Sequence, residues 1–204
     1  MQAMRPHPLQ RPAAPAAHDA PSWAHASGWA QLSGSRQTVS CVLPCRDKAR
    51  TLSKLLPILS DTLTECGYPW EVIVVDCGSM DGTDTLMQAW TELPGFRILP
   101  LAASTLPAEA VEAGILAARG DAVILLDPAL PHTPELIPQM ILRWESDARL
   151  VYAQHESSGG STLRQWDEAR MQRETARPDL MLPPQCLELG LLDRSLVDWL
   201  VQAG

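Results

Sequence analysis

Two aspartates stand where a short apolar run gives way to a turn, and carboxylates in such positions can bind a nucleotide or a cation. Residues 72–75 (Val-Ile-Val-Val) lead directly into Asp76, and a Gly78-Ser79 turn follows. A second apolar run, residues 122–126, leads into Asp127. A carboxylate accepts hydrogen bonds and is also an oxygen ligand for Mg²⁺. We therefore expect Asp76 to accept hydrogen bonds from a base, and Asp127 to contact the ribose or a divalent ion.

Both aspartates also have a structural alternative. An aspartate at the start of a turn can accept hydrogen bonds from the backbone amides that follow it. Asp76 would then cap the turn through the amides of Gly78 and Ser79, and Asp127 would do the same before Pro128. The sequence leaves the binding role and the capping role open for each residue.

The elements that must position these aspartates alternate between strand and helix from Val39 to Gln154. The apolar patterning predicts strands at 39–43, 71–75, 96–99, 122–126 and 150–153, and helices at about 47–66, 82–91, 107–118 and 133–144. Strands this apolar are typical of a parallel sheet covered on both faces. Ligands of such sheets bind beyond the carboxyl ends of the strands, where both aspartates lie. We predict an α/β fold, a Rossmann-like three-layer sandwich with a mostly parallel central sheet.

Local signals mark the ends of the first helix. Asp47 is in position to cap its start, and Gly67 fits the position just after its end. Pro57 lies inside the predicted helix and indicates a kink.

The two ends of the chain have a different composition from the middle. Residues 1–37 are rich in Pro and Ala, cannot offset the entropy of ordering, and are predicted to form a disordered tail. The folded domain is therefore expected at 38–204, with the nucleotide-binding half at 38–154. Beyond Gln154 we expect a Gly/Ser link at 157–161, a polar helix at 162–175, a strand at 187–192 and a helix at 195–202.

Charge and composition exclude several classes of partner. The 204-residue chain has a net charge of −8, which disfavours nucleic acid and anionic membrane surfaces. Five cysteines without metal-ligand spacing favour reduced thiols and a cytoplasmic protein. No apolar run approaches the roughly 20 residues of a membrane helix. The alanines near the N-terminus are interrupted by prolines, so no signal peptide is expected.

Several motifs, in order, resemble the family-2 glycosyltransferases with a GT-A fold. Asp76, Gly78-Ser79 and residues 81–83 (Asp-Gly-Thr) resemble the family's D-D-G-S-x-D-G-T turn. Asp127 to Leu136 resembles its D-A-D-L-Q-H-P-P-E-L segment, and residues 191–194 resemble its L-L-D-R segment. The branch that looks most similar comprises the polyprenyl-phosphate sugar transferases related to dolichyl-phosphate mannose synthase.

The resemblance implies a function and a set of site residues. Members transfer a sugar from a nucleotide-diphospho-sugar, here to a polyprenyl-phosphate or saccharide acceptor, with Mg²⁺ or Mn²⁺ as cofactor. Residues 155–204 would form the acceptor-side half. The family pattern assigns nucleotide binding to Pro44, Asp76, Gly78, Ser79 and Asp127, metal binding to Asp127, and the catalytic base to Glu188.

The departures from the family pattern fall on residues that carry the chemistry. Cys77 replaces an aspartate, and Ala129 replaces the second aspartate of the D-x-D motif. Residues 106–107 are Leu-Pro where the family has Gly-Lys, and residues 187–190 lack the Arg of its G-D-F-R segment. These losses predict weak metal binding. They also support an alternative function, a catalytically inactive module that binds a nucleotide or serves as a scaffold for a protein partner.

Other side chains carry two interpretations each. His132 precedes a helix start and is either a packing residue or a ligand, and Cys77 is either a reactive thiol or a small buried residue. Arg170, Arg173 and Arg177 share one face of a predicted helix. That face would meet a diphosphate or only solvent.

Overall fold

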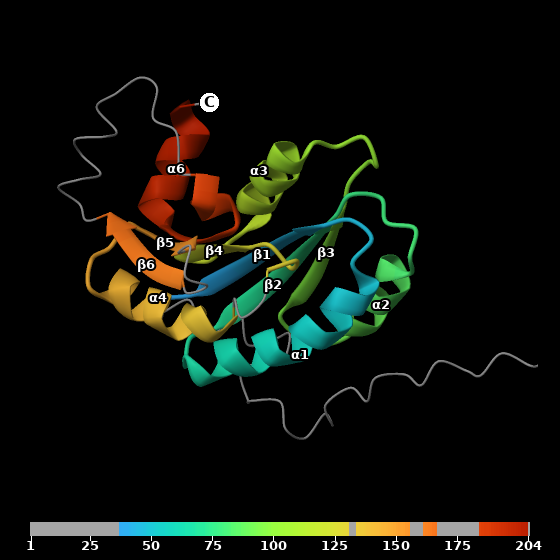
Figure 1. Cartoon of the computed structure of the whole chain (residues 1–204), viewed down its shortest axis with the longest axis horizontal. Helices are drawn as coiled ribbons and strands as arrows, with labels where there is room; N and C mark the ends of the chain where they lie inside the picture. Colours follow the sequence, from blue (N-terminus) through green and yellow to red (C-terminus); the bar gives the residue numbers. More distant parts are fainter. Residues whose placement is uncertain (1–36, 131–133, 156–160, 167–183, 204) are drawn as a thin grey trace, which may run out of the picture.

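Seven strands of the described chain form one sheet in the order β3-β2-β1-β4-β7-β5-β6 (Figure 1). The structure is a computed structural model that describes residues 37–130, 134–155, 161–166 and 184–203. The predicted tail, His132 and the three arginines at 170–177 lie outside these residues. The strands are β1 (Val39–Cys45), β2 (Trp70–Asp76), β3 (Phe96–Pro100), β4 (Ala122–Leu126), β5 (Leu150–His155), β6 (Ser161–Trp166) and β7 (Leu189–Asp193).

The first four strands are parallel, and their carboxyl ends meet at one edge. In register, Cys45 of β1 pairs with Asp76 of β2, which pairs with Pro100 of β3. Strand β7 then joins β4 in the antiparallel sense, and β5 and β6 extend the sheet with two further antiparallel pairs. The predicted α/β sandwich is confirmed, and its sheet is mixed.

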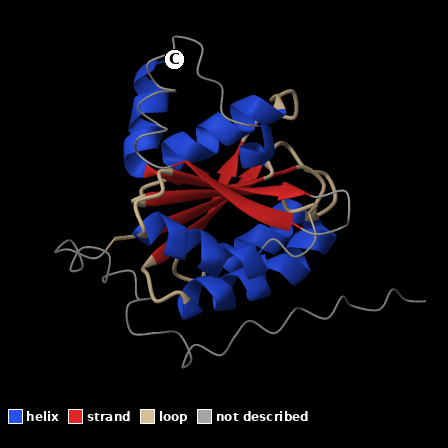
Figure 2. Cartoon of the chain, turned by 60° about the vertical axis from the view of Figure 1, so that its left-hand side comes forward, coloured by secondary structure: helices blue, strands red, loops and turns tan. Residues whose placement is uncertain are grey.

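Helices cover both faces of the sheet (Figure 2). One face packs against α1 (Ala49–Glu65), α2 (Thr83–Thr91) and α4 (Ile137–Glu145), and the other against α3 (Pro107–Ala117) and α6 (Arg194–Ala203). Short 3₁₀ turns, Pro134–Leu136 and Pro184–Leu187, precede α4 and β7. None of the described helices is both long and apolar enough to span a bilayer.

Close packing of α3 on the sheet depends on Gly114. A Cβ atom at this position would lie 2.3 Å from Cγ1 of Val42 and 3.0 Å from Cγ2 of Val75. Because core side chains have no room to retreat, any larger residue would force the helix away from β1 and β2. The small residue therefore sets the distance between α3 and the strands that carry the candidate site.

The predicted polar helix at 162–175 is wrong in its described part. Residues Ser161–Trp166 form β6, which pairs with β5 from His155↔Ser161 to Leu150↔Trp166. Thr162 and Leu163 are half-buried, and Leu163 packs against the core. Pairing with the otherwise open edge of β5 satisfies the backbone hydrogen bonds, and this tertiary context outweighs the polar composition.

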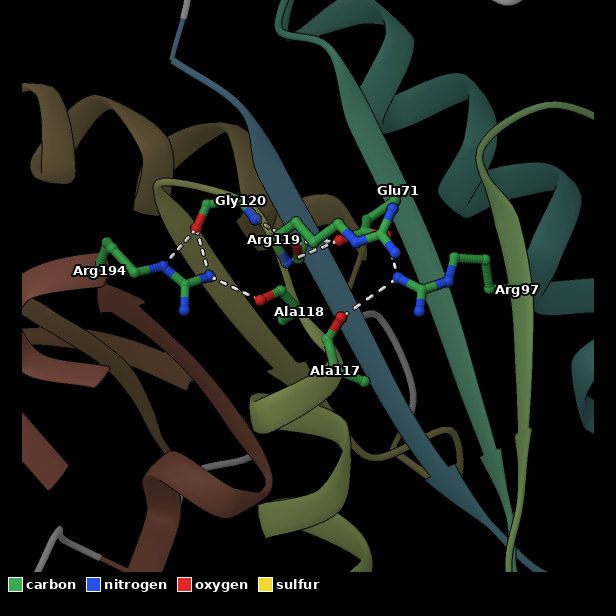
Figure 3. Close-up of polar contacts among 8 residues, drawn as sticks. Glu71, Arg97, Ala117, Ala118, Arg119, Gly120 and Arg194 are labelled. Atoms are coloured by element: carbon green, nitrogen blue, oxygen red, sulfur yellow. Dashed lines mark hydrogen bonds and ion pairs between the residues drawn. The ribbon is translucent and has the colours of Figure 1, made fainter. Parts of the chain in front are cut away.

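A buried carboxylate organises the opposite edge of the sheet, at the amino ends of β1 and β2 (Figure 3). Glu71 is 6% exposed and accepts hydrogen bonds from Ser40 Oγ at 2.8 Å, from the Arg119 amide at 2.8 Å and from Arg97 Nη1 at 2.7 Å. Arg97 Nη1 also donates to the Ala117 carbonyl at 3.2 Å. Glu71 therefore connects β1 and β3 to the turn between α3 and β4.

Arg194 holds the same turn from the other side. Its Nε donates to the Gly120 carbonyl at 2.8 Å, and its Nη2 donates to the Ala118 carbonyl at 3.0 Å (Figure 3). The Gly120 amide donates to Ser40 Oγ at 2.8 Å. Two arginines and a glutamate thus fix the turn at residues 117–120.

A second buried carboxylate, Asp193, joins β7 to α4. Trp144 Nε1 donates to its Oδ2 at 2.9 Å, and Arg149 Nη1 donates to its Oδ1 at 3.0 Å. The backbone amide and the hydroxyl of Ser195 also donate to Oδ1. Burial alone would raise the pKa of Asp193, but the hydrogen bonds from Ser195 and Trp144 and the charge of Arg149 outweigh it and keep the pKa below its ordinary value.

The lowered pKa of Asp193 predicts acid sensitivity. A carboxyl group with a depressed folded-state pKa stabilises the protein above its unfolded-state pKa of about 3.9, and that contribution is lost as the pH falls toward the folded-state value. We expect Asp193→Asn to be less stable than wild type at pH 7 but to lose less stability between pH 5 and pH 3, measured by urea unfolding. Asp61→Asn, at an exposed position on α1, should follow the wild-type profile. Identical pH profiles for the wild type and Asp193→Asn would contradict this assignment.

Candidate functional site

The carboxyl ends of β1, β2 and β4 bring most of the predicted site residues to one edge of the sheet. Pro44 pairs with Val75 one residue before the end of β2, and Asp76 is the last residue of that strand. Gly78 and Ser79 form the turn that follows. Asp127 is the first residue after β4.

Asp76 does cap its own turn, through Ser79. Its Oδ1 accepts hydrogen bonds from the Ser79 amide at 3.2 Å and from the Ser79 hydroxyl. The carboxylate is 6% exposed, and no described residue donates a hydrogen bond to its Oδ2. The capping role that the sequence left open therefore occupies one oxygen and leaves an acceptor on the other.

Gly78 is required by the shape of this turn. Its φ of +68° lies in the left-handed region, and an added Cβ would come within 2.9 Å of the backbone and side chain of Ala103. The turn after β2 therefore packs directly against the loop after β3. The loops after β2 and β3 therefore lie next to each other at this edge of the sheet.

Asp47 does not cap α1, contrary to the sequence prediction. The helix begins at Ala49, and Lys48 occupies the cap position. The side chain of Lys48 makes no cap hydrogen bond. Asp47 has a φ of +52°, donates its amide to Ser79 Oγ at 2.8 Å and accepts from the Met80 amide at 2.8 Å. Its carboxylate joins the loops after β1 and β2.

Asp81 supplies the cap of α1 from the neighbouring loop. Its Oδ2 accepts from the Ala49 amide at 2.8 Å, and its Oδ1 accepts from the Thr83 hydroxyl at 2.6 Å and the Thr83 amide at 3.1 Å. The hydrogen bond from the Thr83 hydroxyl is the main cause of the lowered pKa of Asp81. The side chain is therefore an ionised, structural carboxylate that holds the starts of α1 and α2 together.

Backbone pairing places Glu188 beside Asp127. Strands β4 and β7 are antiparallel with Leu126 opposite Leu189, and the Asp127 amide donates to the Glu188 carbonyl at 2.7 Å. Asp127 is half-buried and Glu188 is exposed. Residues far apart in sequence, which the family pattern assigns to metal and to base, are therefore neighbours.

The described residues offer little for a metal ion. Within them, no group of three or more His, Cys, Asp or Glu side chains is placed to hold one. Asp127 Oδ1 accepts from the Ala129 amide at 2.8 Å, and Ala129 is exposed. A magnesium ion is commonly held by one or two carboxylates together with substrate phosphates. Asp127 fits that limited role, as a single carboxylate.

The start of α3 brings no cation to the site. The Leu106 amide donates to Glu109 Oε2 at 2.8 Å, which completes a hydrogen-bonded start for the helix at Pro107. Glu112 is exposed on the same helix. The residues that stand in place of the family's Gly-Lys pair therefore cap a helix and carry no positive charge.

Cys77 is a buried thiol. It is 7% exposed, and burial, followed by the charge of Asp76, raises its pKa while the charge of Arg46 lowers it. Burial likewise raises the pKa of Cys45 to about 12. Because the thiolate is the reactive form, the structure favours the small buried residue over the reactive thiol.

Arg46 lies at the same edge of the sheet, and sequence reasoning assigned it no role. It is the first residue after β1, its side chain is exposed, and its Nη1 donates to the Ala103 carbonyl at 2.9 Å. The available signal in the sequence was a charged residue two positions after Pro44, just beyond the first predicted strand. Its contact with the loop after β3 could not be read from sequence, because the two residues are distant along the chain.

One family model matches most of the chain, and the similar proteins include glycosyltransferases. The model of glycosyl transferase family 2 matches residues 40–193. An uncharacterized glycosyltransferase of Synechocystis sp. is 29% identical over 80% of this chain and 52% of its own length. The undecaprenyl-phosphate 4-deoxy-4-formamido-L-arabinose transferase of Pseudomonas aeruginosa is 31% identical over 63% of this chain and 38% of its own.

A solved structure supports the same fold. Glucosyl-3-phosphoglycerate synthase from Mycobacterium tuberculosis, in complex with Mn²⁺, UDP and glucosyl-3-phosphoglycerate, superposes with a TM-score of 0.54 at 21% identity, over 82% of this chain and 60% of that one. The chain spans about half or less of the length of the two curated relatives.

Proposed function

Because the chain belongs to glycosyl transferase family 2, we propose that it binds a nucleotide-diphospho-sugar at the carboxyl edge of its parallel strands and transfers the sugar to a lipid-phosphate or saccharide acceptor. One observation carries this proposal: β2, β4 and β7 bring Asp76, Asp127 and Glu188 to the same edge of the sheet. That edge is where open α/β sheets bind their ligands.

Each residue has a role that its contacts allow. Asp76 accepts a hydrogen bond from the base through Oδ2, since Oδ1 is held by Ser79. Pro44 and the Gly78-Ser79 turn line the same strand ends. Asp127 contacts the ribose or an ion. For a saccharide acceptor, the exposed residue Glu188 accepts the proton of the hydroxyl that attacks the sugar, while the bond from the sugar to the nucleoside diphosphate breaks. A lipid phosphate is already ionised and attacks through a phosphate oxygen without this base.

A divalent ion fits only as a partner of the donor. Asp127 would hold Mg²⁺ or Mn²⁺ together with the two phosphates of the nucleotide-sugar. When bound, such an ion neutralises charge on the departing nucleoside diphosphate. The Mn²⁺ and UDP in the mycobacterial structure support this assignment for the family fold. The name of the P. aeruginosa relative supports a polyprenyl-phosphate as one class of acceptor.

A second candidate is nucleotide binding without turnover. It is favoured by Ala129 in place of a carboxylate and by Pro107 in place of a cation, because both remove charge that would stabilise the leaving diphosphate. The domain would then serve as a nucleotide-binding or scaffold module for a protein partner. Sugar release from a labelled nucleotide-sugar distinguishes the two candidates.

Calorimetric titration of UDP and GDP tests the shared binding site. Asp76→Asn keeps an oxygen for Ser79 but replaces the second acceptor with a donor. We expect it to weaken nucleotide binding about 10- to 150-fold, the effect of losing a hydrogen bond to a charged group. Asp84→Ala, which removes an exposed carboxylate in the first turn of α2, is the matched control and should bind as the wild type does.

Two results would count against the proposal. Equal affinities for wild type and Asp76→Asn would restrict Asp76 to its turn. Absence of binding by every nucleoside diphosphate, with and without Mn²⁺, would remove the nucleotide site altogether and leave a scaffold.

A further inference from the structure

Arg46 links the end of β1 to the loop after β3, on either side of the strand that ends at Asp76. It starts from the end of β1, and its guanidinium reaches the Ala103 carbonyl in the loop after β3. Strand β2 lies between β1 and β3 in the sheet. Ala103 also lies against Gly78 in the turn after β2, so the bond to Ala103 holds the guanidinium beside that turn.

The turn that presents Arg46 is fixed from several sides. The next residue, Asp47, has a left-handed backbone and is bonded through its amide to Ser79 and through its carboxylate to the Met80 amide. Ser79 is in turn bonded to Asp76. The backbone of Arg46 and the carboxylate of Asp76 therefore belong to one hydrogen-bonded unit, which limits how far they can move apart.

Arg46 and Asp76 both act on the neighbouring thiol of Cys77 but, among the described residues, do not form an ion pair with each other. Their charges influence the pKa of that thiol in opposite directions. Asp76 retains an acceptor at Oδ2. The guanidinium carries five N–H groups, and its bond to Ala103 uses Nη1. A hydrogen-bond acceptor and a hydrogen-bond donor are thus available over the same strand end.

We propose that Arg46 is a specificity-determining residue. It donates a hydrogen bond to a carbonyl of the nucleotide's base, and Asp76 accepts a hydrogen bond from the ring N–H next to that carbonyl. This inference rests on the proposed nucleotide site. Uracil and guanine each present a ring N–H next to a carbonyl on their Watson–Crick edge. Cytosine and adenine present the reverse pattern, a ring nitrogen acceptor next to an amino group. The Asp76 and Arg46 pair therefore selects uridine or guanosine donors and rejects cytidine and adenosine donors.

The test compares four nucleoside diphosphates with the full chain by calorimetry. Wild type should bind UDP more tightly than CDP, or GDP more tightly than ADP, by about tenfold or more, since a mismatch leaves charged groups without partners. Arg46→Met should bind the preferred nucleotide, UDP or GDP, about tenfold more weakly than the wild type does. Its affinity for the corresponding CDP or ADP should change little. Lys48→Met removes the same charge from the same turn and should leave the ranking of the four unchanged.

A phosphate-free arm separates base reading from general attraction of an anion. Uridine and cytidine in competition with the diphosphates should show the same ranking and the same loss in Arg46→Met. Melting curves of Arg46→Met and Lys48→Met should agree within a few degrees, because Arg46 is exposed.

Other outcomes would overturn the inference. If Arg46→Met weakens all four diphosphates equally and leaves the nucleosides unchanged, Arg46 contacts phosphate. If it lowers the melting temperature and every affinity together, its bond to Ala103 is structural. If Asp76→Asn weakens UDP or GDP while Arg46→Met changes nothing, the nucleotide site stands and only the role of Arg46 fails. Absence of any nucleotide binding by the wild type would end both proposals.

Discussion

Replacing Glu71 with alanine is expected to lower the free energy of unfolding by about 3 kcal/mol, near the lower end of the range for breaking a buried ion pair. Three donors lose their acceptor at once: the Ser40 hydroxyl, the Arg119 amide and the Arg97 guanidinium. Ser40 is fully buried, so its hydroxyl cannot turn to solvent. The Arg97 side chain is 38% exposed and can be hydrated, which keeps the loss at the lower end.

The control follows from this asymmetry. Arg97→Met keeps the apolar stem and leaves Glu71 with its bonds from Ser40 and the Arg119 amide. We expect a smaller cost, about 1.5 kcal/mol, because the buried carboxylate loses one charged donor but keeps its other two hydrogen bonds. Urea unfolding at pH 7 measures both variants. Equal losses for the two would show that the ion pair, and not the buried acceptor, stabilises this edge of the sheet.

The alternating strands and helices could be predicted because local patterns and tertiary structure agree there. The run at residues 122–126 is fully buried as β4, with bounds identical to the prediction. Gly67 has the positive φ of +77° expected just after a helix. Parallel strands then place their carboxyl ends together, so Asp76 and Asp127 could be assigned to one edge from the sequence alone.

What the sequence could not show are contacts made between loops. Asp47 is of a residue type that commonly caps helices, and it stands just before α1. Nevertheless, Asp81 from the next loop caps this helix, because the Asp81 carboxylate accepts a hydrogen bond from the Ala49 amide. The strand β6 depends on the open edge of β5, a neighbour that the polar residues after Ser161 do not reveal. The contact of Arg46 with Ala103 likewise depends on the order of strands in the sheet.

The last prediction concerns the metal and the reaction. Because residue 129 is an alanine, Asp127 is the single carboxylate that the proposed site offers to a metal ion. The phosphates of the nucleotide-sugar must supply the other ligands. The affinity of the wild type for a nucleotide-sugar should therefore change little when Mn²⁺ is added. Ala129→Asp should make binding depend on Mn²⁺, because a second carboxylate next to Asp127 provides another oxygen ligand. Ala129→Asn, which adds similar volume without charge, is the control.

Turnover should require a positively charged side chain at position 107 as well as the second metal-binding carboxylate at position 129. Pro107 is the first residue of α3, where Lys can be accepted without removing a helical hydrogen bond. Loss of one group that stabilises transition-state charge typically costs about 10²–10³-fold in kcat. We therefore expect the double variant, Ala129→Asp with Pro107→Lys, to release sugar from labelled nucleotide-sugars faster than the wild type by a factor of about that size. Because the two groups act on the same diphosphate, either single variant should recover less. Strong Mn²⁺-dependent turnover by the wild type would refute this account, since the native residues would then suffice to stabilise the leaving group.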